Sequence, residues 1–357
     1  EKSKKRVLLP DTRKNYIMKK SVFVFVIVII LLLVALVVVK CVQDGIDDPE
    51  EVQVRQPVVS SGEKTSVTVY FLTSDRLYLL PISMLVTTTN EAAKVAMEKL
   101  LAGQHVPAAI DLFPNDTKLV NLFSIEDTVY IDLTADFLLM TDAEIIDAVR
   151  AIAATVMPLT EGDAFVILVE GESLPEDLQM GGLSLSGEIP YLPVVNLTEA
   201  SRQLLSENDF SLEGLTALHY YLPEASGAYL LPLTVLLSQD SSELDAATIV
   251  QLAIDELLRT PEGGGIYLLP TTNIQLQGVE IADGVAYCDF DESILESYGQ
   301  LAENLLLQCL VRTVTAQEGI ESMQITVNGE IAAQTASGID ISLPLTADTP
   351  LNQVSSN

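Results

Sequence analysis

The chain has 357 residues, enough for two ordinary domains, and carries 50 acidic against 19 basic residues for a net charge of −31. A chain this acidic repels phosphate backbones and anionic headgroups, which excludes nucleic-acid binding. Its 48% hydrophobic residues exclude a disordered polyanion, and three cysteines are too few for a disulfide framework or a CxxC-type metal site.

The charge is divided unevenly along the chain. Residues 1–40 hold nine Lys/Arg and two acidic residues, so the rest of the chain carries a net charge of −38. Residues 22–39 are 18 apolar residues without a break, which at about 1.5 Å per residue can cross the hydrocarbon core of a membrane. Eight basic residues precede this run. The positive-inside rule therefore predicts a cytoplasmic basic segment at 1–21, a transmembrane signal anchor at 22–39 and an exported, extracytoplasmic body.

Cys41 directly follows the apolar run, where a lipoprotein has its lipid-modified cysteine. Lipoprotein signals place a small residue just before that cysteine, but here the residue is Lys40. No A-x-A-like cleavage site follows. The sequence favours an uncleaved anchor, with lipidation of Cys41 as the alternative.

The body repeats itself after an acidic, Pro- and Gly-containing stretch at 40–64 that we interpret as a linker stalk. VYFLTSDRLYLLP matches HYYLPEASGAYLLP, AMEKLLAG matches AIDELLRT, and VILVEGE matches MQITVNGE. The offset between matching segments stays near 150 to 158 residues, as shown by positions 69 and 219 or 172 and 330. We therefore predict two tandem domains, 65–198 and 215–346, followed by a disordered tail at 347–357.

Each copy shows the same order of predicted elements. Alternating strands end in LYLLP or AYLLP, where proline is expected to terminate a strand at a sheet edge. A helix follows, then a strand pair that turns at 126–127 or 283–284, a second helix, and a strand leading to a Gly-containing turn. The first helices carry an apolar face of Ala93, Met97 and Leu100, or Ile249, Ala253 and Leu257, and the second helix of copy one carries Ile145, Val149, Ile152 and Val156. The predicted fold class is α+β: two small mixed-sheet domains with two helices each, the helices on one face of a small sheet, after a transmembrane helix.

The strand TVYIDLTADF raises the question of a catalytic carboxylate pair, because Asp132 and Asp136 lie four residues apart at its end. The repeat tests this: Asp289 corresponds to Asp132, but Ser293 replaces Asp136. The pair is not reproduced, so we expect these aspartates to bond backbone N–H groups.

The residues after the recurring Tyr-x-Asp pattern are Thr134 in one copy and Asp291 in the other. Each stands before a predicted helix, and both residue types are good N-caps. We therefore predict that their side chains cap these helices.

No other pattern predicts chemistry. The sequence has no G-x-S-x-G, P-loop or G-x-G-x-x-G motif, and neither His105 nor His219 has a metal-ligand spacing. Cys288 lies in a strand and Cys309 in an apolar helix, which favours buried thiols, with a disulfide between them as an alternative. We predict no catalytic, cofactor-binding or metal-binding residues and no cofactor.

These features together resemble the GerMN domain family of sporulation and spore germination proteins, whose domains often occur in tandem. The resemblance rests on the VYFL and HYYL strands, the helices ending KLLAG and ELLRTP, the VYIDLT and AYCDFD strands, and the VEGE and VNGE turns. It implies a membrane-tethered extracytoplasmic protein that is similar to ring-building modules and has no catalytic residues. The implied partners are sporulation-channel proteins or peptidoglycan.

The leading hypothesis is a non-enzymatic, membrane-anchored scaffold or interaction protein that acts in sporulation or germination and supports a trans-envelope assembly. Its partners would be envelope or channel proteins, itself, and the membrane through residues 22–39. The alternative is a peptidoglycan-binding envelope module, although aromatic residues make up only 6% of the chain and Trp is absent. A hydrolytic enzyme is the third hypothesis, and it would require a carboxylate or Ser/His site.

Overall fold

The computed structural model describes residues 64–354, apart from residues 104–105, 260–263 and 272. These residues belong to one compact unit, Glu50–Asn357. The predicted basic segment, the signal anchor with Cys41, and the stalk as far as residue 63 lie outside the described residues. Within the described part, no helix combines the length and apolar character needed to cross a membrane.

The first repeat contains two sheets. A hairpin of β1 and β2 is antiparallel, and β3 pairs with the end of β1. The second sheet has the order β10-β6-β5-β4, with β5 and β6 parallel and β4 antiparallel to β5. The strands are β1 (Lys64–Thr73), β2 (Leu79–Thr87), β3 (Ala109–Ile110), β4 (Leu119–Ile125), β5 (Thr128–Leu133), β6 (Ala164–Val169), β7 (Glu172–Ser173), β8 (Gln179–Met180), β9 (Leu183–Ser184) and β10 (Ile189–Pro190).

Two α-helices, α2 (Ala92–Ala102) and α3 (Asp142–Val156), fill the space beside the hairpin. A capping box starts α3: the Thr141 hydroxyl accepts from Glu144 N, and the Glu144 carboxylate accepts from Thr141 N at 3.0 Å. The predicted apolar face of α3 is buried. Two short 3-10 helices flank α3, η1 (Ala135–Leu139) and η2 (Met157–Leu159).

The second repeat has the same order of elements. The hairpin of β11 and β12 is followed by a sheet of order β13-β14-β15-β16, in which β14 and β15 are parallel. Its elements are β11 (Thr216–Pro223), β12 (Leu230–Leu237), η3 (Ser241–Glu243), α5 (Ala246–Leu258), β13 (Leu276–Ala282), β14 (Val285–Phe290), η4 (Glu292–Leu295), α6 (Gln300–Thr315), β15 (Ser322–Val327) and β16 (Glu330–Ile331). The predicted α+β class, the two helices in each copy and the two predicted turns are confirmed.

A buried threonine explains why each repeat has two sheets where one was predicted. Thr155 of α3 accepts a hydrogen bond at 3.0 Å from Tyr70 N on the edge of β1. Thr313 of α6 accepts the equivalent bond from Tyr221 N of β11, also at 3.0 Å. Because a helix side chain satisfies this edge N–H, the hairpin does not continue into the neighbouring sheet. The helices consequently contact both sheets, as α5 does with β11 and β13.

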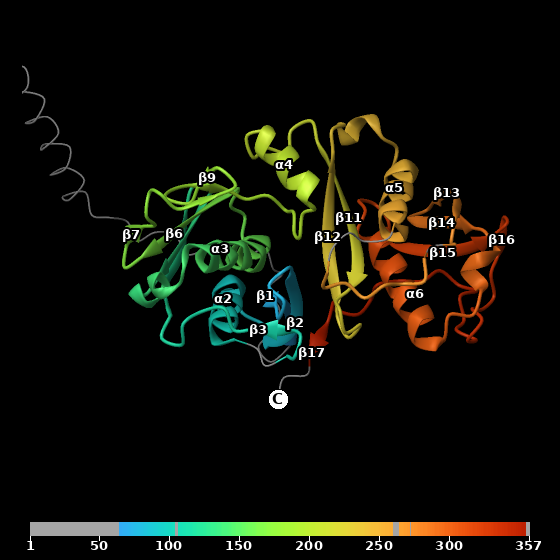
Figure 1. The fold of residues 1–357 in the computed structure, drawn as a ribbon, viewed down its shortest axis with the longest axis horizontal. Coiled ribbons are helices and arrows are strands. Elements are labelled where there is room, and N and C mark those ends of the chain that lie inside the picture. Colours follow the sequence, from blue (N-terminus) through green and yellow to red (C-terminus); the bar gives the residue numbers. More distant parts are fainter. Residues whose placement is uncertain (1–63, 104–105, 260–263, 272, 355–357) are drawn as a thin grey trace, which may run out of the picture. The chain divides into compact units, whose positions relative to one another are not determined.

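Two segments outside the predicted domains, residues 199–214 and the predicted disordered tail, contain regular structure. A helix, α4 (Glu199–Glu207), follows the first repeat, and its N-cap Thr198 accepts from Ser201 N. The predicted disordered tail instead contains β17 (Gln353–Val354), which pairs in parallel with β2. The tail is ordered because it pairs with the edge of β2 that β1 leaves free, and β2 belongs to the first repeat. In Figure 1, β12 lies next to β2, and the helices of each repeat lie on the far side of its own hairpin.

Candidate functional site at the junction of the two repeats

The strand-end aspartates have a structural role. Asp132 Oδ1 accepts a hydrogen bond from Gly171 N at 3.0 Å, in the turn after β6. Asp289 Oδ1 accepts from Gly329 N at 2.8 Å and from the Thr326 hydroxyl at 2.8 Å. Each carboxylate therefore fixes the turn that follows the neighbouring parallel strand, which is the backbone-binding role predicted for it.

The predicted capping role of Thr134 and Asp291 is wrong. Both stand at the N-cap of a 3-10 helix, but neither side chain accepts from a backbone N–H of that helix, although the Ser293 hydroxyl in η4 donates to Asp291 Oδ1. The Thr134 hydroxyl accepts from Lys118 N at 3.0 Å, and Asp291 Oδ1 accepts from Gln275 N at 3.2 Å. Each side chain thus ties its loop to the residue just before β4 or β13, the first strand of the antiparallel pair.

The thiols and the described histidine lie inside the second repeat. Cys288 and Cys309 are both buried and free, so the alternative of a disulfide between them is not realised. Burial raises the pKa of the Cys288 thiol to about 12 and also raises the pKa of Cys309. His219 lies in β11 with Nδ1 3.2 Å from the Thr234 hydroxyl, and burial lowers its pKa. His105 lies outside the described residues.

The most elaborate polar arrangement lies where the two hairpins meet, and it centres on two asparagines. Asn196 is buried, and its amide bonds the exposed edge of β2 like a partner strand. Its Oδ1 accepts from Leu79 N at 2.7 Å, and its Nδ2 donates to Leu79 O at 2.9 Å. The same Nδ2 donates to Pro232 O of β12, in the second repeat, at 2.8 Å. One side chain thus joins both hairpins.

Asn352 repeats this arrangement from the other end of the chain. Its Oδ1 accepts from Leu230 N at 2.8 Å, and its Nδ2 donates to Leu230 O at 2.7 Å. Nδ2 also donates to Pro81 O of β2 at 2.8 Å. Each asparagine therefore bonds the N–H and the C=O of one leucine in one hairpin and a proline carbonyl in the other.

The prolines explain why side chains are needed at this junction. Pro81 and Pro232 were predicted to terminate strands, but both lie inside β2 and β12. A proline carbonyl has no matching N–H on the same residue, so a regular ladder cannot form between the two strands at these positions. The amide groups of Asn196 and Asn352 supply the missing donors.

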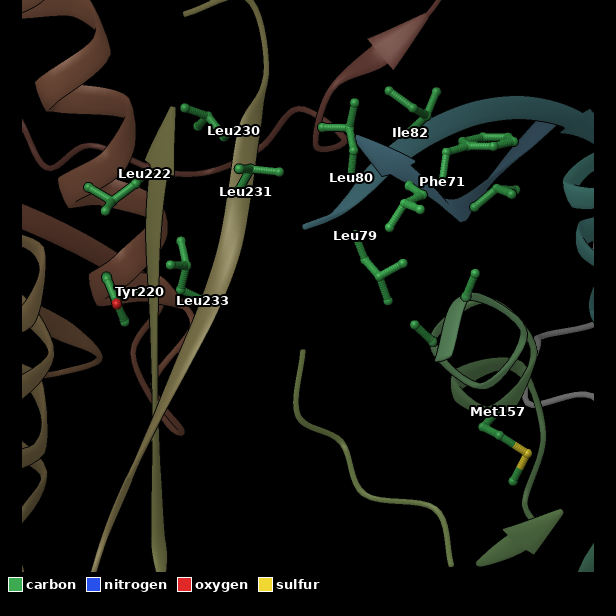
Figure 2. Packing of buried hydrophobic residues seen from close by; sticks show 14 of the residues in the cluster. Phe71, Leu79, Leu80, Ile82, Met157, Tyr220, Leu222, Leu230, Leu231 and Leu233 are labelled. Atoms are coloured by element: carbon green, nitrogen blue, oxygen red, sulfur yellow. The ribbon is translucent and has the colours of Figure 1, made fainter. Parts of the chain in front are cut away.

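The segments that follow the asparagines cross between the repeats. Leu197, after the first repeat, forms a parallel bridge with Thr234 of β12. Gln353, after the second repeat, pairs in parallel with Ser83 of β2. Between them, Figure 2 shows Leu231 of β12 pointing toward Leu80 of β2, and both side chains are fully buried. Each repeat is therefore completed by the end segment of the other.

Sequence reasoning missed both asparagines, because Asn196 falls at the very end of the predicted first domain and Asn352 falls in the predicted disordered tail. A signal was present. Asn196 and Asn352 are separated by an offset within the range that relates the two copies. Both also have positive φ, 53° and 49°, which asparagine tolerates better than most residues.

The family model described as "Germane: Sporulation and spore germination" matches residues 68–175 and 219–332, more than half of the chain. The chain belongs to this family. The "Spore germination protein GerM" of Bacillus subtilis (strain 168) is 24% identical over 290 residues, which cover 77% of this chain and 75% of that protein. The solved structure of the "Tandem GerMN domains of the sporulation protein GerM from Bacillus subtilis" has a TM-score of 0.58 at 22% identity and covers 82% of this chain and 99% of that chain. The predicted resemblance is confirmed.

The two Germane repeats thus meet in a junction where asparagine amides and backbone groups bond one another. Among residues 64–354, excluding the undescribed gaps, no group of three His, Cys, Asp or Glu side chains could hold a metal ion. What the arrangement supplies is a fixed connection between two similar domains.

Proposed function

We propose that this Germane-family protein is a non-enzymatic scaffold that supports a trans-envelope assembly in sporulation or spore germination. Family membership supports a role in one of these processes. The observation that carries the scaffold proposal is the reciprocal junction, in which Asn196 and Asn352 make six hydrogen bonds to the two hairpins. Two domains joined in this way act as one rigid spacer.

The proposed location is the outer side of the cell membrane. Residues 22–39 would anchor the chain with its N-terminus in the cytoplasm, and the acidic body would extend away from it. The body's net charge of −38 favours a partner with a basic surface and disfavours anionic lipid headgroups.

The proposed assembly surface is the outer edge of β4. This strand ends its sheet and has no partner on that side among the described residues. Val120 and Ile125 on it are 51% and 49% exposed. An exposed apolar edge strand is a template for pairing with another chain, either a second copy or an envelope protein.

Sedimentation of residues 50–357 tests the proposal, alone and mixed with the extracytoplasmic domains of sporulation-channel proteins. We expect self-association or co-sedimentation, and we expect Val120→Lys with Ile125→Lys to abolish it. Gln277→Lys is the matched control, because Gln277 holds the place of Val120 in the edge strand β13 of the second repeat. A strictly monomeric protein that ignores every channel domain would contradict the scaffold. Binding to purified peptidoglycan sacculi alone would replace it with the wall-binding alternative.

A further inference from the structure

A cavity of about 640 Å³ lies beside the first repeat and borders the junction, because Leu79 and Asn196 are among its lining residues. Its walls come from α3, from the segment 189–197 and from α4. The volume lies within the range of roughly 300–1,000 Å³ that small-molecule sites usually have. Most of the lining is apolar and includes Leu79, Val149, Ala153, Phe165, Ile189 and Leu205.

Most of the polar side chains in this cavity are already bonded to protein groups. Asn196 is used in the junction, Gln203 donates to Glu207 at 2.8 Å, and Ser206 donates to Gly181 O at 3.2 Å. A sugar needs many free donors and acceptors, and this cavity does not offer them. Hydrogen bonds from the cavity to a ligand must therefore come from side chains that are not yet fully bonded to protein groups.

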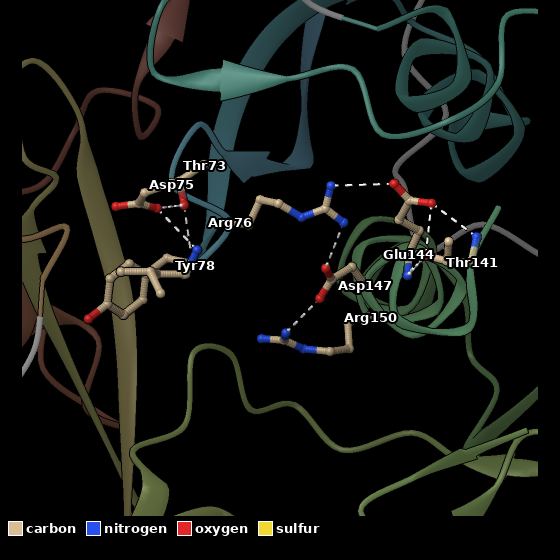
Figure 3. Close-up of polar contacts among 9 residues, drawn as sticks. Thr73, Asp75, Arg76, Tyr78, Thr141, Glu144, Asp147 and Arg150 are labelled. Carbon is tan, nitrogen blue, oxygen red and sulfur yellow. Dashed lines mark hydrogen bonds and ion pairs between the residues drawn. The ribbon is translucent and has the colours of Figure 1, made fainter.

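Those groups are donors. Arg150 on α3 is half-buried and, among the described residues, bonds only Asp147, with Nη1 3.3 Å from Oδ1 (Figure 3). A guanidinium has five N–H donors, so most of those on Arg150 remain available. Arg202 on α4 also lines the cavity and bonds Glu199 at 2.7 Å and Leu197 O at 2.8 Å. Burial and, to a smaller extent, the nearby Arg202 lower the pKa of Arg150 against the opposing effect of Asp147, and the guanidinium stays charged.

Two phenols add neutral donors to the same walls. Tyr70 and Tyr191 line the cavity, and neither hydroxyl has a protein acceptor within the described residues. Burial raises the pKa of both phenols, so both keep their protons at neutral pH. The Glu199 carboxylate also lines the cavity, but Arg202 pairs with it, which leaves Arg150 and the two phenols as the side chains that can donate to a ligand. An apolar cavity with such donors is complementary to an apolar chain with an anionic end.

We propose that this cavity binds a long-chain fatty acid, with the acyl chain against the apolar walls and the carboxylate on Arg150. The guanidinium fork matches a carboxylate in two parallel hydrogen bonds. Arg202 lies near Arg150 and supplies a second guanidinium beside the headgroup, while Tyr70 and Tyr191 add neutral donors to the cavity walls.

Carbon-13 NMR of carboxyl-labelled palmitate, added to residues 50–357 below its micelle concentration, tests the proposal together with calorimetric titration. We expect one saturable site, a shifted carboxyl resonance, and binding at least tenfold weaker for hexadecanol, which has the same chain without the charge. Arg150→Gln should weaken palmitate binding at least tenfold and return the resonance to its free position. Asp147 keeps Arg76 as a partner at 3.5 Å, so this variant should fold, which a thermal melt checks.

Arg202→Gln should weaken binding severalfold. Arg259→Gln should leave binding unchanged, because Arg259 pairs with Glu256 in the same i, i+3 geometry on α5, away from the cavity. Equal affinity for palmitate and hexadecanol would overturn the proposal, as would a folded Arg150→Gln variant that binds palmitate normally. Tighter binding of hexadecyl phosphate than of palmitate would overturn the assignment of the carboxylate headgroup.

Discussion

The two repeats share three side-chain interactions but differ in the elements that surround their common fold. In both, a helix threonine caps the hairpin edge, a strand-end aspartate fixes a glycine turn, and an asparagine after the repeat bonds both hairpins. The first repeat alone has the β8–β9 hairpin and the cavity against α4 among the described residues. The threonine, aspartate and asparagine interactions found in both copies stabilise the fold and the junction. The β8–β9 hairpin and the cavity, found in the first repeat, are available for a separate function.

Of the side-chain interactions found in both copies, those of Asn196 and Asn352 should contribute most to the free energy of unfolding. Asn196→Ala leaves a buried N–H and two carbonyls without partners and places alanine at φ 53°, so we expect a loss of about 3 kcal/mol or more in the free energy of unfolding. Asn352 is half-buried, so Asn352→Ala should cost less. Urea denaturation followed by circular dichroism measures both.

Asn196→Gly separates the two contributions, because glycine accepts positive φ and loses only the hydrogen bonds. With both asparagines replaced by glycine, we expect the single unfolding transition to split into two. A double variant that still unfolds in one step at the original midpoint would show that apolar packing alone couples the repeats.

The helix threonines should have nearly equal effects in the two copies. Thr155→Val and Thr313→Val keep the shape but leave Tyr70 N or Tyr221 N without an acceptor, at a cost of about 2 kcal/mol each. The Ser variants keep the hydroxyl and serve as controls. Equal midpoints for the Val and Ser variants would contradict the role given to the hydroxyl.

The strand-end aspartates should reveal a difference between the copies. Asp289 accepts two hydrogen bonds and Asp132 accepts one in the described structure, so Asp289→Ala should cost about 2 kcal/mol and Asp132→Ala about 1 kcal/mol. Thermal melts of the two variants give the ranking. A larger loss for Asp132→Ala would mean that the turn after β6, with Glu170 and Gly171 at positive φ, depends more on its anchor.

Another difference between the copies is the pH dependence of stability that we expect from Glu303 in the second repeat. Burial acts to raise the pKa of Glu303, but hydrogen bonds from Ser337, Thr335 and Tyr298 outweigh it and lower the pKa to about 2. The folded pKa is below the ordinary value of 4.5, so the stabilisation is complete above pH 4.5 and is lost as the pH falls toward 2.

Glu303→Gln should therefore flatten the fall in urea midpoint between pH 5 and pH 3. The equivalent place in α3, if Thr155 and Thr313 are matched, is the buried Ile145, so the first repeat has no such carboxylate. Glu318→Gln, at an exposed site, is the control. An unchanged slope for Glu303→Gln would show that these hydrogen bonds also form in the unfolded chain.

The sequence predicted what depends on local pattern. The alternation in VYIDLT predicts a strand of the first repeat, and the Asp283-Gly284 pair predicts the turn of a hairpin in the second. The spacing of Ile145, Val149 and Ile152 predicts the buried face of a helix. The role of Asp132 also followed, because the second copy served as a comparison. These features lie within one repeat and within a few residues of each other.

The junction could not be predicted in the same way. Asn352 bonds Pro81 from 271 positions away, and nothing local to an asparagine in a polar tail indicates a distant carbonyl. The cavity likewise depends on where α4, which packs on β12, lies relative to α3. The sequence showed only that the two asparagines are separated by about the same offset as other matching segments of the two copies. This offset indicates a shared role only after the structure shows that the two hairpins meet.

The exchange of end segments gives the junction the symmetry of an isologous interface, in which the same patch on each partner contacts its equivalent on the other. Leu80 meets Leu231, and each asparagine reaches the proline of the opposite hairpin. The two repeats are thus arranged like the partners of a homodimer, but they are joined in one chain. Linking the partners raises their effective concentration, so contacts too weak to join two separate chains can hold within one. The later copies are then free to diverge, as the cavity of the first repeat and Glu303 of the second have done.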